Sequence, residues 1–173
     1  KEALVPFYHR FPMIDNFRAQ LVEKSRSFKK ENRKVLVASL NKQYQDFDIS
    51  EATKSNINSL LSEHTYTITT GHQLNLFTGP LYFLYKIVSV INLSEQLNKK
   101  HSNQHFVPVY WMATEDHDFE EINYFNLFDK KVSWSHESGG AVGALKTDGL
   151  EQLLATLKTK IGASENAKKL TNL

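Results

Sequence analysis

The spacing of the hydrophobic residues changes near residue 64 of this 173-residue chain. Before that point, Ile14, Phe17 and Leu21 lie on one helical stripe, which predicts a helix over residues 14–46. Ser50 is a good N-cap, and apolar residues at the same spacing continue a second helix from there to Leu61. We therefore expect residues 1–63 to form a helical lead-in that packs on a core beginning at residue 64.

Two strand-like runs flank one long helical run in the next part of the chain. Residues 65–70 (TYTITT) are β-branched and aromatic with alternating apolar positions, which predicts a strand. Gly79 and Pro80 favour a helix start, and apolar residues then follow at helical spacing. Residues 106–113 (FVPVYWMA) are continuously apolar, which is typical of a strand covered on both faces. Because this order forms a βαβ unit, we expect two parallel neighbouring strands joined by a helix over residues 80–98.

Beyond residue 113 the pattern predicts shorter elements. They are two strand pieces, a glycine-containing turn region and a helix, over residues 122–128, 132–135, 137–149 and 150–161. Ser164 is a good N-cap for a further helix that is still in progress at Leu173, and the chain does not begin with methionine. We therefore expect a fragment of a longer protein, in which residues 64–173 are the N-terminal part of a core truncated at its C-terminal end.

Composition narrows the classes of function. The chain has 21 basic and 19 acidic residues, a balance that favours neither nucleic-acid nor membrane binding. It has no cysteine, which excludes disulfides, thiolate metal sites and cysteine nucleophiles and fits a reducing cytoplasm. No apolar run approaches the roughly 20 residues of a membrane span, and Lys1 opens no signal peptide. We expect a cytoplasmic protein without a membrane or nucleic-acid partner.

Polar clusters follow both predicted strands of the βαβ unit. GHQLNLFT begins at Gly71 after the first strand, and TEDHDFEE begins at Thr114 after the second. In open parallel sheets, ligands bind beyond the carboxyl ends of the strands. Both clusters should therefore lie on the same rim of the sheet, which makes that rim the candidate site.

The first cluster, residues 71–79, leads into a helix N-terminus, where free N–H groups and the helix dipole favour anions. Six residues of this cluster are expected to bind a ligand. Gly71 and Gly79 permit close backbone approach, and the other four supply donors and acceptors for phosphate or sugar hydroxyls: His72, Gln73, Asn75 and Thr78. The spacing matches neither a Walker A loop nor a G-x-G-x-x-G turn. An alternative is that His72 and Thr78 only cap the helix and close the turn. Lys86, within the helix, is a further candidate, although helix lysines are commonly just solvated.

The second cluster is Glu115, Asp116, His117 and Asp118. Mutual repulsion should raise the pKa of some of these carboxyls, which suits general acid–base work or cation binding. Consecutive positions are poorly spaced for one tetrahedral centre, so we expect no metal. An alternative is an exposed acidic turn in which Asp118 caps the following segment. The next acidic residues, Glu120 and Glu121, are expected to extend that solvated turn.

Two long stretches resemble one enzyme family. GHQLNLFTGPLYFLYK (71–86) and FVPVYWMATEDHDFEEIN (106–123) are similar to the BshC family, the cysteine-adding enzymes of bacillithiol biosynthesis. The resemblance implies an α/β fold with a Rossmann-like parallel sheet core, related to class I aminoacyl-tRNA synthetases and nucleotidylyl transferases. It also implies addition of cysteine to glucosaminyl-malate. Family members are longer and carry a C-terminal coiled coil that forms a dimer, so we expect a homodimer only in the complete protein.

The resemblance also implies roles for the two clusters. His72, Asp116, His117 and Asp118 are the expected catalytic residues, and Glu115 and Lys86 join the residues of the first loop in binding substrate or nucleotide. Among them His117 is the expected proton carrier, because histidine titrates near neutrality. LFTGP (76–80) stands where class I synthetases carry a pair of ATP-handling histidines, with Phe77 and Pro80 in their places. Use of ATP or ADP as a cofactor therefore stays open.

Two other classes of function remain. The first is a metal-dependent hydrolase built on residues 115–118 with His72. The second is a non-catalytic binding module that uses the basic segment 18–34. Glu23 and Glu31 interrupt that segment and Phe28 is its single aromatic residue, so a solvated helix face is the simpler interpretation.

Overall fold

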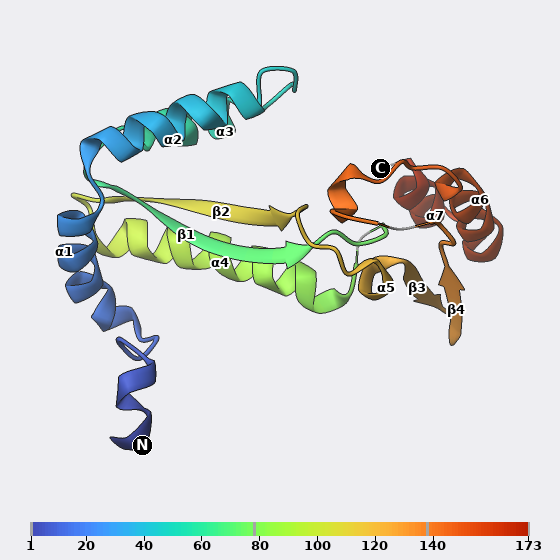
Figure 1. Cartoon of the computed structure of the whole chain (residues 1–173), viewed down its shortest axis with the longest axis horizontal. Coiled ribbons are helices and arrows are strands. Elements are labelled where there is room, and N and C mark those ends of the chain that lie inside the picture. Colours follow the sequence, from blue (N-terminus) through green and yellow to red (C-terminus); the bar gives the residue numbers. More distant parts are fainter. Residues whose placement is uncertain (1, 78, 138, 173) are drawn as a thin grey trace. The chain divides into compact units, whose positions relative to one another are not determined.

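The computed structural model describes residues 2–77, 79–137 and 139–172. Its elements are, in chain order, η1 (Glu2–Phe7), η2 (Ile14–Asn16), α1 (Phe17–Ser27), α2 (Lys30–Gln43), α3 (Glu51–Ser59), β1 (Thr65–Gln73), α4 (Leu81–Lys100), β2 (His105–Ala113), α5 (Phe119–Ile122), β3 (Tyr124–Leu127), β4 (Lys130–Ser133), η3 (Val142–Ala144), α6 (Leu150–Ile161) and α7 (Glu165–Thr171) (Figure 1). They group into two compact units. The first unit comprises residues 1–68 and 90–109, and the second unit comprises residues 69–89 and 110–173. The domain boundary expected at residue 63 stays a prediction.

The predicted βαβ unit is confirmed. Strands β1 and β2 are neighbours in a two-stranded sheet, their arrows run in the same direction, and α4 connects them (Figure 1). β1 continues to Gln73, three residues beyond the predicted end, so Gly71, His72 and Gln73 belong to the strand and not to a loop. Close packing explains part of this extension, because a Cβ on Gly71 would lie 3.2 Å from both the Cβ and the carbonyl oxygen of Trp111 on β2.

The single helix predicted over residues 14–46 is wrong. The segment forms the 3-10 turn η2 and then two helices, α1 and α2, which Phe28 separates in an extended conformation (φ −101°, ψ 100°). The break directs the Phe28 ring toward two cations, with the Arg33 guanidinium 5.2 Å and the Lys24 ammonium 5.6 Å from the ring centroid. Cation–aromatic contact of this kind outweighs the weak preference of a polar segment for an unbroken helix.

Helices α2 and α3 pack on β2 within the first unit. Val37 of α2, Ile57 and Leu60 of α3, and Val107 of β2 form one buried cluster. The predicted cap at Ser50 is confirmed, since its hydroxyl accepts a hydrogen bond from the Thr53 N–H at 3.2 Å. The cap satisfies one of the free donors at the start of α3 and so helps to hold that helix over the cluster.

Arg33 is buried in the same unit, with only 4% of its surface exposed. Its guanidinium donates to the carbonyl oxygens of Leu60 (3.0 Å) and Thr65 (2.9 Å), and to that of Glu63 (3.4 Å). These carbonyls lie at the end of α3 and the start of β1, where a helix leaves acceptors without partners. Arg33 therefore joins α2, α3 and β1 through backbone acceptors, and we call this arrangement the Arg33 clasp.

The end of α4 is fixed to the start of β2. The Asn98 side chain donates to the Phe106 carbonyl (2.9 Å) and accepts from the Phe106 N–H (2.8 Å), and Phe106 is almost fully buried. Lys100 forms an ion pair with Asp15, at the beginning of η2 and α1. This pair lowers the pKa of the Asp15 carboxyl, because the charged form accepts a hydrogen bond from the ammonium group.

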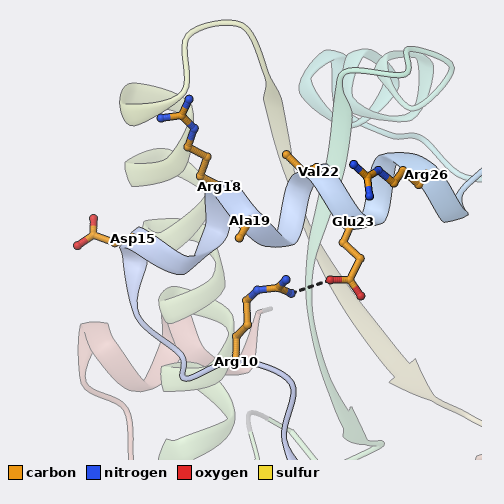
Figure 2. Close-up of a pocket in the computed structure, with 7 residues that line it drawn as sticks. All are labelled: Arg10, Asp15, Arg18, Ala19, Val22, Glu23 and Arg26. Carbon is orange, nitrogen blue, oxygen red and sulfur yellow. Dashed lines mark hydrogen bonds and ion pairs between the residues drawn. The ribbon is translucent and has the colours of Figure 1, made fainter.

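A cavity of about 630 Å³ lies along α1 in the first unit (Figure 2). Its lining residues are Arg10, Asp15, Arg18, Ala19, Val22, Glu23 and Arg26. Arg10 and Glu23 form an ion pair across it at 2.9 Å, with His9 3.1 Å from the same Glu23 oxygen. Salt bridges of this exposed kind contribute little to stability.

The second unit contains a hairpin and two C-terminal helices. β3 and β4 pair antiparallel, with Tyr124 opposite Ser133 and Leu127 opposite Lys130. The turn between them uses positive φ at Phe128 (48°) and Asp129 (59°), as two-residue hairpin turns require. The strand predicted over 122–128 is wrong at its start, because residue 122 is the last residue of α5 and β3 begins at Tyr124.

Two C-terminal predictions, α6 and the Ser164 cap, agree with the structure, whereas the helix expected to continue at Leu173 ends at Thr171. α6 spans the predicted residues 150–161, and the Ser164 hydroxyl caps α7 by accepting from the Ala167 N–H at 3.2 Å. The core of the second unit joins these elements through one cluster of buried residues: Leu76, Phe119, Ile122, Trp134, Val142 and Leu153.

Candidate functional site

A cavity of about 960 Å³ opens in the second unit where β1 leads into α4. Its polar lining residues are His72, Gln73, Asn75, Tyr82, Glu121 and Asn126. Its remaining lining residues are Leu76, Phe77, Gly79, Pro80, Tyr124, Phe125, Leu154, Leu157 and Leu170. A polar end beside an apolar wall is the usual composition of a small-molecule site.

His72 is the centre of the polar end. Its Nε2 is in hydrogen-bonding contact with the Tyr82 hydroxyl, and its Nδ1 lies 3.0 Å from the Gln73 carbonyl oxygen. The same carbonyl accepts from the Asn75 amide at 2.9 Å. Nδ1 also lies 3.1 Å from the Asn75 amide nitrogen, so an acceptor and a donor both face this ring nitrogen and each tautomer of the ring has a partner there. His72 is thus an oriented imidazole joined to a phenol.

The loop between β1 and α4 is closed on itself. Gly79 adopts φ 63°, and a Cβ there would lie 3.1 Å from Asn75, so glycine suits this position for both reasons. The Gly79 N–H donates to the Leu76 carbonyl at 3.2 Å. This N–H thus has a partner within the turn, and the expected role of Gly79 in ligand binding stays a prediction. Thr78, the other hydroxyl expected in this loop, lies outside the described residues.

Gln73 connects the first cluster to the segment after β2. Its amide donates to the Glu121 carboxylate at 2.6 Å, and Glu121 lines the cavity. Glu121 is exposed, as expected of a solvated turn, but it also lines the cavity, which the sequence did not predict. The reason is tertiary, because α5 turns the chain back so that this carboxylate meets the end of β1.

The acidic cluster is not gathered in the cavity. None of Glu115, Asp116, His117 and Asp118 is among the residues that line it. The Trp111 indole donates to Glu115 at 3.4 Å, and the side chains of His117 and Asp118 are exposed. Their assignment as catalytic or binding residues stays a prediction.

Asp116 departs from the expectation that repulsion raises carboxyl pKa values here. Its pKa is lowered, first because its carboxylate accepts a hydrogen bond from the Asp118 N–H at 2.9 Å. Desolvation has the next largest effect and raises the pKa, whereas the Gln73 amide and His117 lower the pKa by smaller amounts. Asp116 therefore stays ionised at neutral pH and organises the turn, whereas Asp118 forms no side-chain cap on α5.

The turn that carries Asp116 is held by η3. The Val142 N–H donates to the Asp116 carbonyl (2.8 Å), and the Gly143 N–H donates to the Thr114 carbonyl (2.9 Å). A Cβ on Gly143 would lie 2.5 Å from the Thr114 Cβ and 2.9 Å from its carbonyl oxygen. Only glycine allows this approach without displacement of the turn.

Gly143→Ala is expected to destabilise the 114–116 turn by about 1–3 kcal/mol, which is the usual cost of overpacking. Gly139→Ala is the matched control, because nothing lies within 4 Å of a Cβ at that position. Hydrogen exchange of peptides covering residues 110–118 and 139–146 should show faster exchange only in the Gly143 variant. Equal exchange in both variants would show that the contact is unimportant.

Lys86 has a structural contact. Its ammonium group donates to the Gly71 carbonyl at 2.7 Å, which ties α4 to β1, and it lies 5.9 Å from the Tyr82 ring centroid. It is not among the residues that line the cavity. The expected substrate contacts of Lys86 and Gly71 stay predictions, and both residues position the strand and helix that carry His72 and Tyr82.

Tyr82 and the aromatic and leucine walls of the cavity are absent from the sequence-based candidates. One signal for Tyr82 exists, since this aromatic residue stands off the apolar stripe of α4 that includes Leu81, Leu84 and Val88. No such feature of the sequence marks the leucine and aromatic residues that line the cavity. Leu154, Leu157 and Leu170 fit the ordinary apolar spacing of helices, and only the packing of α6 and α7 brings them to the cavity.

Within residues 2–77, 79–137 and 139–172, no three His, Asp or Glu side chains come together as a metal-binding group. Over the same part of the chain, no helix is both long and apolar enough to cross a membrane.

The chain is similar to known proteins over its whole length. A family model described as the N-terminal Rossmann-like domain of the bacillithiol biosynthesis protein BshC matches residues 1–173. A relative from Flavobacterium johnsoniae, named "Putative cysteine ligase BshC", is 55% identical over 100% of this chain and 33% of its own length. Relatives with the same name from Christiangramia forsetii and Cytophaga hutchinsonii are 53% and 46% identical, over 97% and 91% of this chain and 32% and 30% of their own lengths.

The comparisons confirm the family and the fold class inferred from the two motif stretches. The chain spans about a third of the length of the curated relatives that it matches. The parallel strands β1 and β2 with α4 and the N-terminal helices are thus an incomplete Rossmann-like α/β core. The chain belongs to the BshC family of bacillithiol biosynthesis and corresponds to its N-terminal Rossmann-like domain.

Proposed function

We propose that the protein containing this chain is a cytoplasmic cysteine ligase that joins the carboxyl group of cysteine to the amine of glucosaminyl-malate. The relatives' printed names support a cysteine ligase, and the family description supports bacillithiol biosynthesis. The single structural observation that carries the proposal is the oriented His72–Tyr82 pair at the polar end of a cavity large enough for a sugar conjugate.

The chemistry requires a neutral amine and an activated carboxyl group. The amine nitrogen forms a bond to the carboxyl carbon, the bond from that carbon to its leaving oxygen breaks, and the nitrogen gives up its extra proton. In this proposal, His72 Nε2 takes that proton directly or through the Tyr82 hydroxyl. Imidazole suits the task because its pKa lies near neutral pH.

ATP or ADP is the cofactor that the family resemblance implies, but the cavity does not fit a nucleotide's phosphates. No lysine or arginine is among its described lining residues, and the Gly79 N–H is already paired. Phe77, at the place of a synthetase histidine, packs edge-on against Phe125 with ring centroids 4.9 Å apart. We therefore derive no step through a nucleotide, and we propose that any nucleotide is bound by residues outside this cavity.

The acidic turn and the assembly complete the proposal. Asp116 would act through Gln73, as a positioning residue for the polar end of the cavity. His117, Asp118 and Glu115 would contact a substrate only when other parts of the longer protein face them. A coiled-coil homodimer of the complete protein, with no nucleic-acid or membrane partner, is likewise proposed.

The test is an assay of the full-length protein with cysteine and glucosaminyl-malate, with and without ATP. We expect a product whose mass equals the sum of the two substrates less one water, detected by mass spectrometry. Stoichiometric zinc or manganese in the purified protein, together with hydrolysis and no ligation, would instead support the metal-dependent hydrolase.

A further inference from the structure

Glu121 gives the cavity its only formal charge. Among the described lining residues, Glu121 is the one carboxylate and there is no lysine or arginine. An anionic ligand would meet this carboxylate without a compensating cation, whereas a cationic group would be attracted by it. The electrostatics next to Glu121 thus favour an amine over a phosphate or a carboxylate at that position in the cavity.

The carboxylate is held in place on one side. Gln73 Nε2 donates to Glu121 Oε2 at 2.6 Å, and no hydrogen bond to Oε1 occurs among the described residues. No basic side chain in the part of the chain that the structure describes forms an ion pair with Glu121. Glu121 therefore has an acceptor left for a ligand and no internal cation that neutralises it.

Two aromatic residues line the same cavity as this carboxylate. They are Tyr124 and Phe125, three and four residues after Glu121, and the Lys131 ammonium already lies 3.8 Å from the Tyr124 ring centroid. An ammonium group is attracted to an aromatic face as well as to a carboxylate. The combination of an oriented carboxylate with neighbouring rings is the chemistry that recognises a primary ammonium group.

We infer that this cavity binds the primary ammonium group of a substrate through Glu121, with Gln73 as the residue that positions the carboxylate. The inference rests on the proposed function for the identity of the ligand, because both proposed substrates carry a primary amine. It assigns Glu121 a role in substrate selection and places the amine at the end of the cavity that also holds His72.

The experiment measures binding to the full-length protein by calorimetry with two pairs of probes. The pairs are glucosaminyl-malate with its N-acetyl derivative, and cysteine with N-acetylcysteine. We expect the wild-type protein to bind at least one amine ten or more times more tightly than its acetylated form. Glu121→Gln should reduce that preference at least tenfold. Glu120→Gln is the matched control, because this exposed neighbour in α5 is not among the lining residues and should leave the preference unchanged.

The outcomes separate the inference from the proposed function. Equal binding of amine and acetylated probes, or an unchanged preference in Glu121→Gln, overturns the inference even when the ligation assay succeeds. Loss of preference in both glutamine variants also overturns it, since the effect would then be general charge and not this carboxylate. Absence of ligation with a preserved Glu121-dependent amine preference overturns the proposed function and leaves the inference standing.

Discussion

Arg33→Met is expected to lower the free energy of opening of the α2–α3 region by about 2–6 kcal/mol. Two carbonyl oxygens, those of Leu60 and Thr65, would lose a donor at 3.0 Å and 2.9 Å while remaining inside the unit. Each buried acceptor left without its partner costs about 1–3 kcal/mol. Methionine keeps an apolar stem of similar length, so the loss reports the hydrogen bonds more than the packing.

Lys34→Met is the matched control for this change. Lys34 is the exposed neighbour of Arg33 in α2, and a surface substitution of this kind usually changes stability by less than about 0.5 kcal/mol. Hydrogen exchange of peptides from α2, α3 and the start of β1 measures the local opening free energy. If both variants exchange equally fast, the Arg33 clasp does not hold these elements together.

His72→Ala is expected to reduce kcat/KM for the proposed ligation by the full-length protein roughly a hundredfold to ten-thousandfold. The reason is that His72 is proposed to take the proton of the amine, and general acid–base catalysis by a positioned side chain contributes about 10²–10⁴-fold. Because His72 also contacts Tyr82 and the Gln73 carbonyl, some loss of stability should accompany the kinetic loss. Tyr82→Phe, which removes only the hydroxyl, should lower the rate with a smaller effect on stability.

Two further histidine variants make this test specific. His105→Ala, at an exposed position at the start of β2, should leave the rate unchanged. His117→Ala addresses the competing assignment of the proton carrier and should have less effect than His72→Ala, because His117 does not line the cavity. A sharp fall in the melting temperature of His72→Ala with normal activity in the folded remainder would identify His72 as a structural cap. A larger loss in His117→Ala would move the proton transfer to the acidic cluster.

Local signals were sufficient for much of the fold. The βαβ order, the bounds of α6, and the caps at Ser50 and Ser164 follow from hydrophobic spacing and N-cap chemistry, which depend on neighbours in the chain. The break at Phe28 and the extra residues of β1 do not follow from such local signals. The break depends on the contact of Arg33 with the Phe28 ring, and the strand extension depends on the packing of Gly71 against Trp111. Contacts of this kind do not appear in the spacing of hydrophobic residues along the sequence.

The candidate site shows the same division. The β1–α4 junction was predictable as a site, because ligand positions follow from the direction of parallel strands. Glu121 was not predictable, since its place depends on how α5 turns the chain after β2. The pKa prediction for the acidic cluster failed for a related reason. Counting like charges predicted raised pKa values, but one backbone N–H at 2.9 Å decides the pKa of Asp116 in the opposite direction.

The Arg33 clasp has a consequence for how the first unit responds to acid. A guanidinium stays charged at any ordinary pH, and backbone carbonyls do not titrate, so no partner in the clasp changes charge as protons are added. The Asp15–Lys100 pair differs, because the lowered pKa of Asp15 means that its contribution is present above the unfolded value and is lost as the pH falls through the folded value, below 3.8. Because the Asp15–Lys100 pair is exposed, its loss in strong acid should change the stability of the unit only a little, whereas the Arg33 hydrogen bonds continue to join α2, α3 and β1.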